Sequence, residues 1–537
     1  MSLVLKVSTS FGASVALYVL YKVYGVLYHA LMSPVRGLPG LSSSNIFIGN
    51  MQEMMFMDQA EAHERHTREL GTTFKFKAPL WDDWLFTADV KAIGHVFRKD
   101  TGIWQKPRFF AYNLSKLFGP GIILVDSDEH KKQACLLNPA FSPSEIKRFT
   151  VTFLDKAVKL RDIWAAQIQQ AGEERRRIDV LSWLSRTTLD IIGETGFGYK
   201  FDALTEEPGK PNELHDAFRA IFNVGTSPSI IRLLRGLMPA ARFVPAEGDA
   251  EVENARETMY RIGRRLLAER ELSVDLRQPE KTSGDEDDIL SILVRANASS
   301  DSQNKLPDEQ VVAQIPNFVI AGHETSSTAT AWALFSIAQD QSIQKRLREE
   351  LLAVPSESPS MDELNALPYL DAVVRESLRF HCPVPAITRV ATEDDVLPLH
   401  TPVVDKSGKV RNELKVLKGQ TIFISLIMAN RLEEIWGKDA SEFNPDRWSS
   451  PPEAAMSIPG VWGNILSFLG GPRACIGYRF SVLEIKALIF ILIRAFEFEL
   501  AVPASDIIKR TEVVVRPVLR SDPGNSNQLP LLVRPIA

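Results

Sequence analysis

The sequence has few cysteines and lacks the common nucleotide-binding motifs. Only three cysteines occur among its 537 residues, Cys135, Cys382 and Cys475, and no two of them form a C-x-x-C pair. This spacing excludes a disulfide framework and a zinc knuckle, and it is typical of a reducing compartment. No G-x-G-x-x-G or P-loop sequence is present. The formal net charge of −5 argues against a nucleic-acid partner.

What the chain does contain is one dense group of unusual residues around Cys475. The stretch reads Phe468-Leu469-Gly470-Gly471-Pro472-Arg473-Ala474-Cys475-Ile476-Gly477. Tyr478 to Leu500 then alternates apolar and polar residues at helical spacing, with Glu484 and Lys486 on the expected polar side. Cys475 is therefore expected to end a glycine-bearing loop and to open a helix.

A cysteine in this position is suited to bind a metal as a thiolate. Amide groups at a helix start point toward the sulfur and favour its anionic form. Arg473 adds a permanent cation two residues away, and Gly471 and Gly477 permit backbone angles or close approaches that a side chain would forbid. A buried structural cysteine is the alternative. Chance matches at these offsets are rare, roughly a few in a hundred thousand for average residue usage.

The stretch resembles the haem-binding motif of the cytochrome P450 family, F-x-x-G-x-R-x-C-x-G, with every fixed position matched. The resemblance implies a mainly α fold with small β-sheets. It also implies haem b (iron protoporphyrin IX) with Cys475 as the axial thiolate ligand of the iron, and it assigns Phe468, Gly471 and Arg473 to cofactor binding. Thiolates of this kind push electron density onto the iron and favour O–O cleavage.

A second motif lies in a long predicted helix, from Pro307 to about Arg348. The sequence Ala321-Gly322-His323-Glu324-Thr325-Ser326 puts an acid, a hydroxyl and a glycine in an apolar helix interior, which is costly unless they are used. Thr325 is expected to turn its hydroxyl onto a backbone carbonyl, leaving a groove for dioxygen and water. The motif resembles the family's [AG]-G-x-[DE]-T-[TS], which implies that Thr325 hydrogen-bonds to dioxygen and that Glu324 relays protons. A purely back-bonded hydroxyl is the alternative for Thr325 alone.

A third motif is structural. Glu376 and Arg379 are three residues apart on a predicted helix and share a face. They resemble the family's E-x-x-R, a buried pair completed by an arginine from a later segment, for which Arg447 is the candidate. The resemblance implies that the three hold the loop behind the haem and do no chemistry.

The residues that would hold the haem propionates match the family only in part. Arg389 takes the place of a propionate-binding arginine. Before Pro139-Ala140-Phe141, where many members have W-x-x-x-R, this chain has His130 and Ala134. His130 can still donate a hydrogen bond and Ala134 cannot, so Lys131 and Lys132 are the candidates to compensate.

The N-terminal region predicts a membrane attachment. Phe11 to Met32 is mainly apolar and as a helix would be about 33 Å long, enough to cross a bilayer. We therefore predict an anchor at residues 1–32, with a helix lying on the membrane surface as the alternative. Pro34, Pro39 and Gly40 predict a stiff hinge over residues 33–50, which resembles the hinge of microsomal family members. One catalytic domain is expected over residues 51–537.

Elsewhere the pattern predicts helix over residues 148–203 and a short hairpin over Thr73 to Phe86. Strands are predicted between Val396 and Ile424 and again between Val513 and Val533.

Together these features predict a membrane-anchored haem-thiolate monooxygenase. It would insert one oxygen atom of dioxygen into a lipophilic small molecule, such as a terpenoid or another intermediate of secondary metabolism. The likeness to microsomal members implies the endoplasmic reticulum membrane, a single span, and a catalytic domain facing the cytosol. Electrons would come from NADPH-cytochrome P450 reductase, with cytochrome b5 as a further candidate. A haem-thiolate isomerase or dehydratase, and a haem-binding carrier or sensor without catalysis, are the alternatives.

Overall fold

The computed structural model describes most of the chain from Ser33 to Ile536. Outside the description lie residues 1–32 except Leu17, 44, 46–47, 57, 80–81, 101, 206–211, 226–229, 238, 277–286, 302–303, 512, 523, 525 and 537. The predicted anchor at residues 1–32 therefore lies outside the described residues. Within the described part of the chain, no helix combines the length and the apolar character needed to cross a bilayer.

The chain forms two compact units, and the first is built on a mixed sheet. Residues 1–105 and 386–425 make up this unit. Its strands are β1 (Thr73–Lys77), β2 (Asp83–Thr87), β3 (Trp104–Gln105), β5 (Ala386–Ala391), β6 (Asp395–Val404), β7 (Val410–Val416) and β8 (Thr421–Ser425). Its helices are α2 (Gln59–Leu70) and α3 (Val90–Arg98), with a 3-10 turn at Pro34–Gly37 and a π turn at Gln52–Phe56.

Aromatic side chains hold this sheet together across its strands. The order is β1-β2-β8-β5-β3, and β6 pairs with β7 in a separate hairpin. Phe74 of β1 lies opposite Phe86 of β2, with ring centroids 4.3 Å apart, and Phe86 lies opposite Phe423 of β8 at 6.1 Å. Cross-strand aromatic pairs of this kind stabilise a sheet. The predicted hairpin over Thr73 to Phe86 and the strands predicted between Val396 and Ile424 are confirmed.

The second unit, residues 106–385 and 426–537, is mainly helical. Its helices are α4 (Arg108–Phe118), α5 (Ser127–Leu137), α6 (Pro143–Ala171), α7 (Val180–Phe197), α8 (Glu213–Gly225), α9 (Ile230–Leu237), α10 (Asp249–Leu276), α11 (Ile289–Ala298), α12 (Asp308–Val312), α13 (Gln314–Gln339), α14 (Gln341–Leu352), α15 (Met361–Asn365), α16 (Pro368–His381), α17 (Leu426–Ala429), α18 (Glu433–Trp436) and α19 (Tyr478–Ala495). Short 3-10 turns lie at Asn138–Phe141, Ala203–Thr205, Pro239–Phe243, Pro445–Ser449, Glu453–Ser457, Gly471–Arg473 and Ala504–Asp506.

Two small sheets complete this unit. β4 (Arg176–Asp179) pairs with β12 (Pro530–Pro535), which pairs with β9 (Phe496–Leu500); β10 (Ile507–Thr511) pairs with β11 (Val515–Leu519). The strands predicted between Val513 and Val533 are thereby confirmed, as is the mainly α fold with small sheets.

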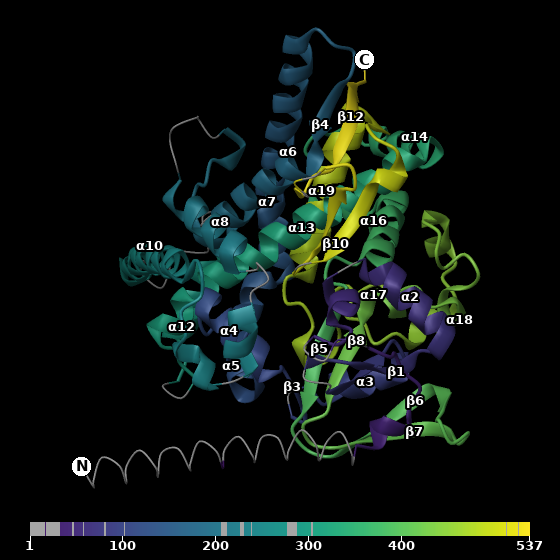
Figure 1. The fold of residues 1–537 in the computed structure, drawn as a ribbon. Helices are drawn as coiled ribbons and strands as arrows, with labels where there is room; N and C mark the ends of the chain where they lie inside the picture. Colours follow the sequence, from purple (N-terminus) through teal and green to yellow (C-terminus); the bar gives the residue numbers. More distant parts are fainter. Residues whose placement is uncertain are drawn as a thin grey trace. The chain divides into compact units, whose positions relative to one another are not determined.

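Helix α13 is the centre of the second unit and packs against α7 and α19 (Figure 1). Gly322 lets α7 approach α13, because a Cβ at that position would lie 2.9 Å from Cδ1 of Ile192. Trp332 of α13 is fully buried, and its indole N–H donates to the carbonyl of Val515. The segment with the acid and the hydroxyl is thus carried by the most enclosed helix of the unit.

Two helix predictions need correction. The helix predicted from Pro307 to about Arg348 is three helices, with breaks at Ala313 and Asp340. Asp340 adopts an extended backbone, and its carboxylate caps α14 by accepting from the N–H groups of Ser342 and Ile343. Pro316 lies in the first turn of α13, where the missing N–H costs nothing. The helix predicted over 148–203 is interrupted by β4, since Gly172 ends α6 with φ of +65°.

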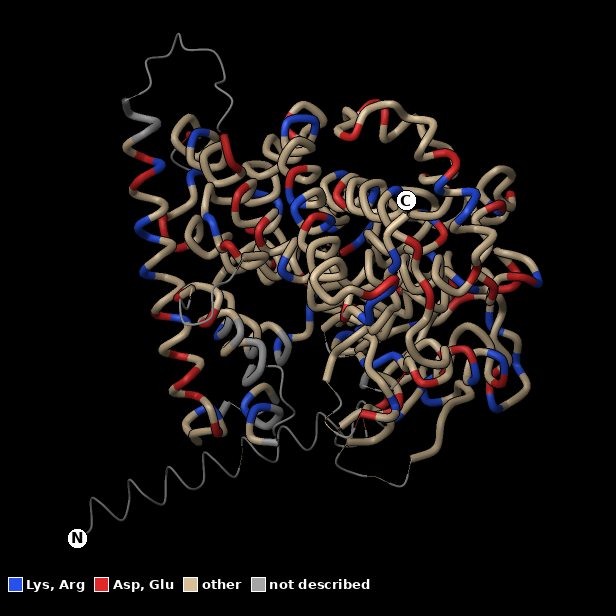
Figure 2. Tube along the Cα trace, turned by 90° about the horizontal axis from the view of Figure 1, so that it is seen from above, with Lys and Arg blue, Asp and Glu red and all other residues tan. Residues whose placement is uncertain are grey.

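Helix α10 shows how charge is distributed on the outside of this unit. The acidic residues Asp249, Glu251 and Glu253 lie in its first turns, and the basic residues Arg261, Arg264 and Arg265 lie in its middle (Figure 2). Neighbouring opposite charges on a helix attract one another weakly and keep the surface hydrated. Both signs of charge are therefore present along this helix.

Candidate functional site

The loop before α19 fixes Cys475 by backbone contacts. The Cys475 N–H donates to the carbonyl of Phe468 at 2.9 Å, and Phe468 is buried. Gly471 has φ of +69°, which suits a glycine, but Leu469 has φ of +58°. A leucine in this left-handed region costs roughly 1–2 kcal/mol. The loop keeps a strained shape directly ahead of the cysteine.

The thiol of Cys475 is accessible yet surrounded by protein. Its side chain is exposed, while burial raises its pKa to about 11, against which a Gly477 N–H hydrogen bond acts only in part. The thiol thus keeps an accessible surface while the protein around it disfavours its charged form. The Gly477 amide acts to lower this pKa, as expected at the start of a helix, but α19 begins only at Tyr478 and desolvation outweighs the one amide. A bound cation is needed to make this sulfur anionic at neutral pH.

The turn of α13 that carries the second motif is also open. Ala321 is exposed in a helix whose flanking turns are buried, and Thr325 Oγ1 donates to the Ala321 carbonyl at 2.5 Å. The hydroxyls of Ser326 and Ser481 lie 3.1 Å apart and join α13 to α19. The hydroxyl of Thr325 is thus back-bonded, as expected, and the two motif segments are connected through their next neighbours.

Glu324 lies in a partly enclosed group of charges. Its Oε2 accepts from Nε of Arg516 at 3.1 Å and from Nη2 at 2.5 Å, and its Oε1 lies 3.8 Å from Nδ1 of His323. Burial acts to raise the pKa of Glu324, but the electrostatic interactions with His323 and Arg516, together with the hydrogen bond from Arg516, outweigh it and leave the pKa below its usual value. Glu324 is therefore an ionised carboxylate held by one oxygen.

Glu376 and Arg379 form a closed ion pair. Arg379 donates through Nε at 2.9 Å and Nη2 at 2.7 Å to the two carboxylate oxygens, and both side chains are fully buried. Arg447 reaches Glu376 at 3.5 Å, but its closer partner is Asp439, with two hydrogen bonds of 2.9 and 2.8 Å. The backbone N–H of Asn444 also donates to Glu376. The structure brings the three predicted residues together and adds Asp439.

The predicted propionate ligands of the second unit lie around α5. Arg473 is buried and lies 2.6 Å from a carboxylate oxygen of Asp126. His130 is buried on α5, whereas Lys131 is exposed and Lys132 half-buried. Asp126 already occupies the guanidinium of Arg473, so a propionate would share this cation with a protein carboxylate.

Arg389 belongs to the other unit and is engaged there. Its Nε and Nη2 donate to the two carboxylate oxygens of Asp100, and Nη1 donates to the carbonyl of Thr388. Both members of this ion pair are buried. Its role toward a propionate stays a prediction.

The residues of the second unit fit a haem held through sulfur. An accessible, desolvated thiol at the end of a shaped loop is suited to a single metal–sulfur bond, and an exposed turn with a hydroxyl is connected to it through Ser326 and Ser481. The buried guanidinium of Arg473 adds a cation two residues from the sulfur. These features agree with a flat group that carries carboxylates.

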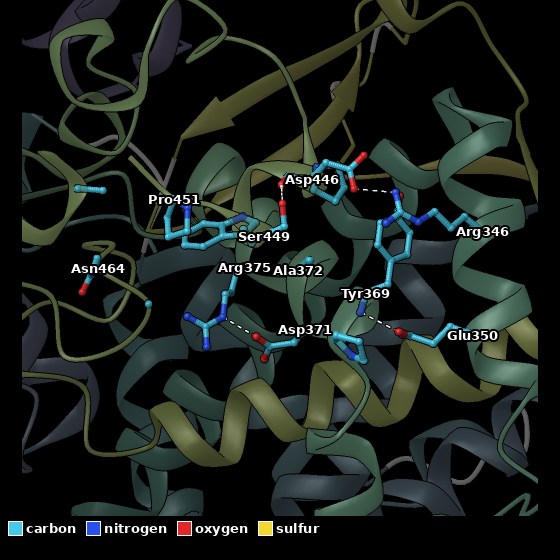
Figure 3. Close-up of a pocket in the computed structure, with 15 residues that line it drawn as sticks. Arg346, Glu350, Tyr369, Asp371, Ala372, Arg375, Asp446, Ser449, Pro451 and Asn464 are labelled. Atoms are coloured by element: carbon cyan, nitrogen blue, oxygen red, sulfur yellow. Dashed lines mark hydrogen bonds and ion pairs between the residues drawn. The ribbon is translucent and has the colours of Figure 1, made fainter. Parts of the chain in front are cut away.

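A separate surface hollow of about 640 Å³ lies between α14, α16 and the turn at Pro445–Ser449 (Figure 3). Arg346 pairs with Asp446 at 2.6 Å, and Arg375 pairs with Asp371 at 2.5 Å. The Tyr369 N–H donates to Glu350. Since the charged side chains drawn there pair with one another, the hollow resembles a solvated surface groove more than a reaction site.

Several residues of the site were missed by sequence reasoning. Arg516 carries no motif and is distant in sequence from Glu324, so only the pairing of β10 with β11 beside α13 could reveal it. Glu484 and Lys486 are fully buried, so their expected polar side is wrong. Lys486 pairs with Asp371 at 2.8 Å, and burial raises the pKa of Glu484 to about 8.

Comparison with known proteins agrees with this geometry. The family described as Cytochrome P450 matches residues 39–521. Cytochrome P450 monooxygenase 205 of Postia placenta is 44% identical over 98% of this chain and 97% of its own length. Cytochrome P450 monooxygenase 128 of the same fungus is 41% identical over 97% of both chains. Ganoderic acid synthetase of Ganoderma lucidum is 33% identical over 93% of this chain and 94% of its own.

The chain belongs to the cytochrome P450 family. It is a monooxygenase of that family, an oxidoreductase with a haem-thiolate cofactor. Members of the family need a redox partner and act on lipophilic substrates.

Proposed function

We propose that this enzyme binds haem b through the sulfur of Cys475 and inserts one oxygen atom of dioxygen into a lipophilic small molecule. The observation that carries the proposal is the state of this thiol, accessible although the surrounding protein desolvates it. A structural cysteine would be covered, as Cys382 is. When bound, the haem supplies the activation of dioxygen.

The protein's own residues position the group and handle protons. Cys475 would hold the haem iron as a thiolate, and the Gly477 N–H would stabilise its negative charge. Arg473 and His130 are the donors of the second unit for propionates, and Phe468 and Gly471 shape the loop. Thr325 can release the Ala321 carbonyl and donate its hydroxyl into the open turn. Glu324, ionised and partly accessible, exchanges protons with solvent.

Electrons and location follow from the family likeness. We infer that NADPH-cytochrome P450 reductase donates the electrons, with cytochrome b5 as a second donor. Residues 1–32 anchor the protein to the endoplasmic reticulum membrane with the catalytic domain in the cytosol. The apolar character of residues 11–32 supports the anchor.

The substrate we propose is a terpenoid or another intermediate of secondary metabolism. The support is a relative whose name assigns it to the synthesis of ganoderic acid, at 33% identity along most of both chains. A likeness of this degree supports a substrate class and no single compound.

Co-expression with the reductase tests this function. Extractable products are profiled for the natural enzyme, for Cys475→Ser, and for Cys135→Ser as a control that removes an exposed thiol on α5. We expect oxygenated products and the thiolate-type Soret shift of the reduced carbon monoxide complex to vanish only in Cys475→Ser. Haem binding and the Soret shift unchanged in Cys475→Ser would contradict the assignment.

A further inference from the structure

His323 connects the acid of the second motif to helix α7. Its Nε2 lies 2.6 Å from Oγ of Ser185 on α7, and its Nδ1 lies 3.8 Å from Oε1 of Glu324. The side chain is 14% exposed and that of Glu324 is 18% exposed. One imidazole thus spans the space between a hydroxyl and a carboxylate.

The two ring nitrogens face different partners, and this decides the tautomer. A carboxylate accepts hydrogen bonds only, so the proton belongs on Nδ1, which faces Glu324. Nε2 then accepts the hydroxyl proton of Ser185. Burial lowers the pKa of His323, and although Glu324 opposes this, the positive charges of Arg516 and His215 add to it. The resting ring is therefore neutral, with a donor toward the acid and an acceptor toward α7.

Two hydroxyl groups hold the backbone of His323 and make no contact with its ring nitrogens. Thr188 of α7 donates its hydroxyl to the carbonyl of His323 at 3.0 Å, and Ser327 donates to the same carbonyl at 2.8 Å. The charged groups that face the ring are Glu324 on its own helix, Arg516 on β11 and His215 on α8. The nitrogens remain available for Ser185 and Glu324.

Arg516 binds the Oε2 side of Glu324, and its position in the sheet costs free energy. It lies directly opposite Arg510 in the β10–β11 pair, and like charges at opposed positions destabilise a sheet. Its contacts with Oε2 of Glu324 offset that repulsion. They also leave Oε1 as the oxygen turned toward His323.

We propose that His323 is a positioning residue of the oxygenation reaction, passing protons from Ser185 to Glu324. The inference rests on the proposed function, because it takes Glu324 as the acid of proton delivery. Glu324 pivots on Arg516 by about 1 Å to bring Oε1 within hydrogen-bond distance of Nδ1.

The transfer balances as follows in atoms and charge. The Nδ1–H bond breaks as an O–H bond forms on Oε1 of Glu324, and the hydroxyl proton of Ser185 moves to Nε2. Ser185 regains a proton from hydronium, which becomes water. Protonation neutralises Glu324 and weakens its ion pair with Arg516, which frees the acid to turn toward Thr325. The ring returns to its first tautomer by exchanging its nitrogen-bound protons with water at its exposed edge.

The test compares His323→Gln, Ser185→Ala and the double variant, co-expressed with the reductase. Thr188→Val is the matched control, because it removes a hydroxyl that bonds only to the backbone of His323 and Ser185 on α7. We expect His323→Gln to lower the product rate about tenfold and to raise the share of electrons lost as hydrogen peroxide. Ser185→Ala should act in the same direction, the double variant should match His323→Gln alone, and the control should stay within about twofold.

The pH profile and one measurement without turnover complete the test. Without the relay, hydronium must reach Glu324 directly, so the product rate of His323→Gln should fall more steeply between about pH 6.5 and 8.5 than that of the natural enzyme. In ¹⁵N-histidine-labelled protein, the signal that His323→Gln removes should report a neutral ring protonated at Nδ1. Multiplying effects in the double variant, or a ring protonated at Nε2, would overturn the relay. Absence of haem in the natural enzyme would instead overturn the proposed function.

Discussion

Two acids of the second unit are each paired with arginine, and they differ in how completely they are satisfied. Glu376 accepts from Nε and Nη2 of Arg379, from the Asn444 N–H and from the Trp448 indole, and it is fully buried. Glu324 is held through one oxygen by Arg516, and its other oxygen has His323 at 3.8 Å.

This difference indicates that Glu376 stabilises the structure and that Glu324 can transfer a proton. A buried ion pair with all its lone pairs used cannot release its acid without leaving charges unpaired in a low dielectric. An acid with one oxygen outside a close hydrogen bond and with some contact to solvent can take up a proton and turn. Two glutamate–arginine pairs in one unit therefore have different roles, and each of the following substitutions tests that distinction.

The largest effect is expected from Glu376→Gln. The change leaves Arg379 and Arg447 buried with one formal negative partner fewer, and breaking a buried pair of this kind costs about 3–5 kcal/mol. We expect little soluble haem-containing protein and a much lower melting temperature, measured by the Soret absorbance on heating. A melting temperature close to that of the natural enzyme would show that this cluster is not structural.

Glu324→Gln is expected to lower the rate of product formation with little change in the unfolding free energy. The amide keeps the shape and one acceptor oxygen but cannot relay a proton, so the product rate should fall roughly a hundredfold. The unfolding free energy should change by only about 1 kcal/mol, since the pair is partly exposed. Product formation and thermal unfolding are measured on the same preparations. A large stability loss with unchanged turnover would reverse the roles of the two acids.

Glu484→Gln tests a third acid, which has no countercharge. Burial raises the folded pKa of Glu484 to about 8, from a usual value of 4.5. Between these values the folded state keeps a proton that the unfolded state releases, so stability falls as the pH rises, by up to about 1.4 kcal/mol per unit. Glu484→Gln lacks this dependence on pH. Its free energy of unfolding should therefore rise relative to that of the natural enzyme from pH 5 to 8. Denaturation at pH 5, 6.5 and 8 measures the gain, and a constant difference across that range would contradict the buried acid.

Glu484 also shows where sequence reasoning stops. Its place in an alternating pattern predicts an exposed polar side, but α19 is covered by α6, α13, α14 and α16, so tertiary packing overrides the periodicity. The same limit hid Arg516, whose partner lies 192 positions away. By contrast, the loop around Cys475, the Glu376–Arg379 pair and most strands follow from local patterns that need no knowledge of packing.

Helix boundaries could be predicted only where residues next to the boundary indicate it. The break before α14 depends on the carboxylate of Asp340, which caps that helix. Asp340 follows a long apolar run, so its role as a capping residue was not predicted from the sequence. The desolvation of the Cys475 thiol could not be predicted either, and it raises the pKa of the free thiol to about 11. Local motifs therefore identified the reacting groups, while their protonation states required the fold.

The smallest effect is expected from Asp446→Asn, which breaks an arginine–acid pair on the surface. Arg346 and Asp446 lie 2.6 Å apart in the hollow of Figure 3, but their side chains are 56% and 61% exposed. Water and salt screen such a pair, so its loss should cost under about 1 kcal/mol and leave product formation unchanged. The substitution keeps the stacking of Arg346 on Tyr369, whose ring centroid is 3.9 Å away. Thermal unfolding at low and high salt is the measurement. A cost near that of Glu376→Gln would mean that exposure does not separate these arginine–acid pairs.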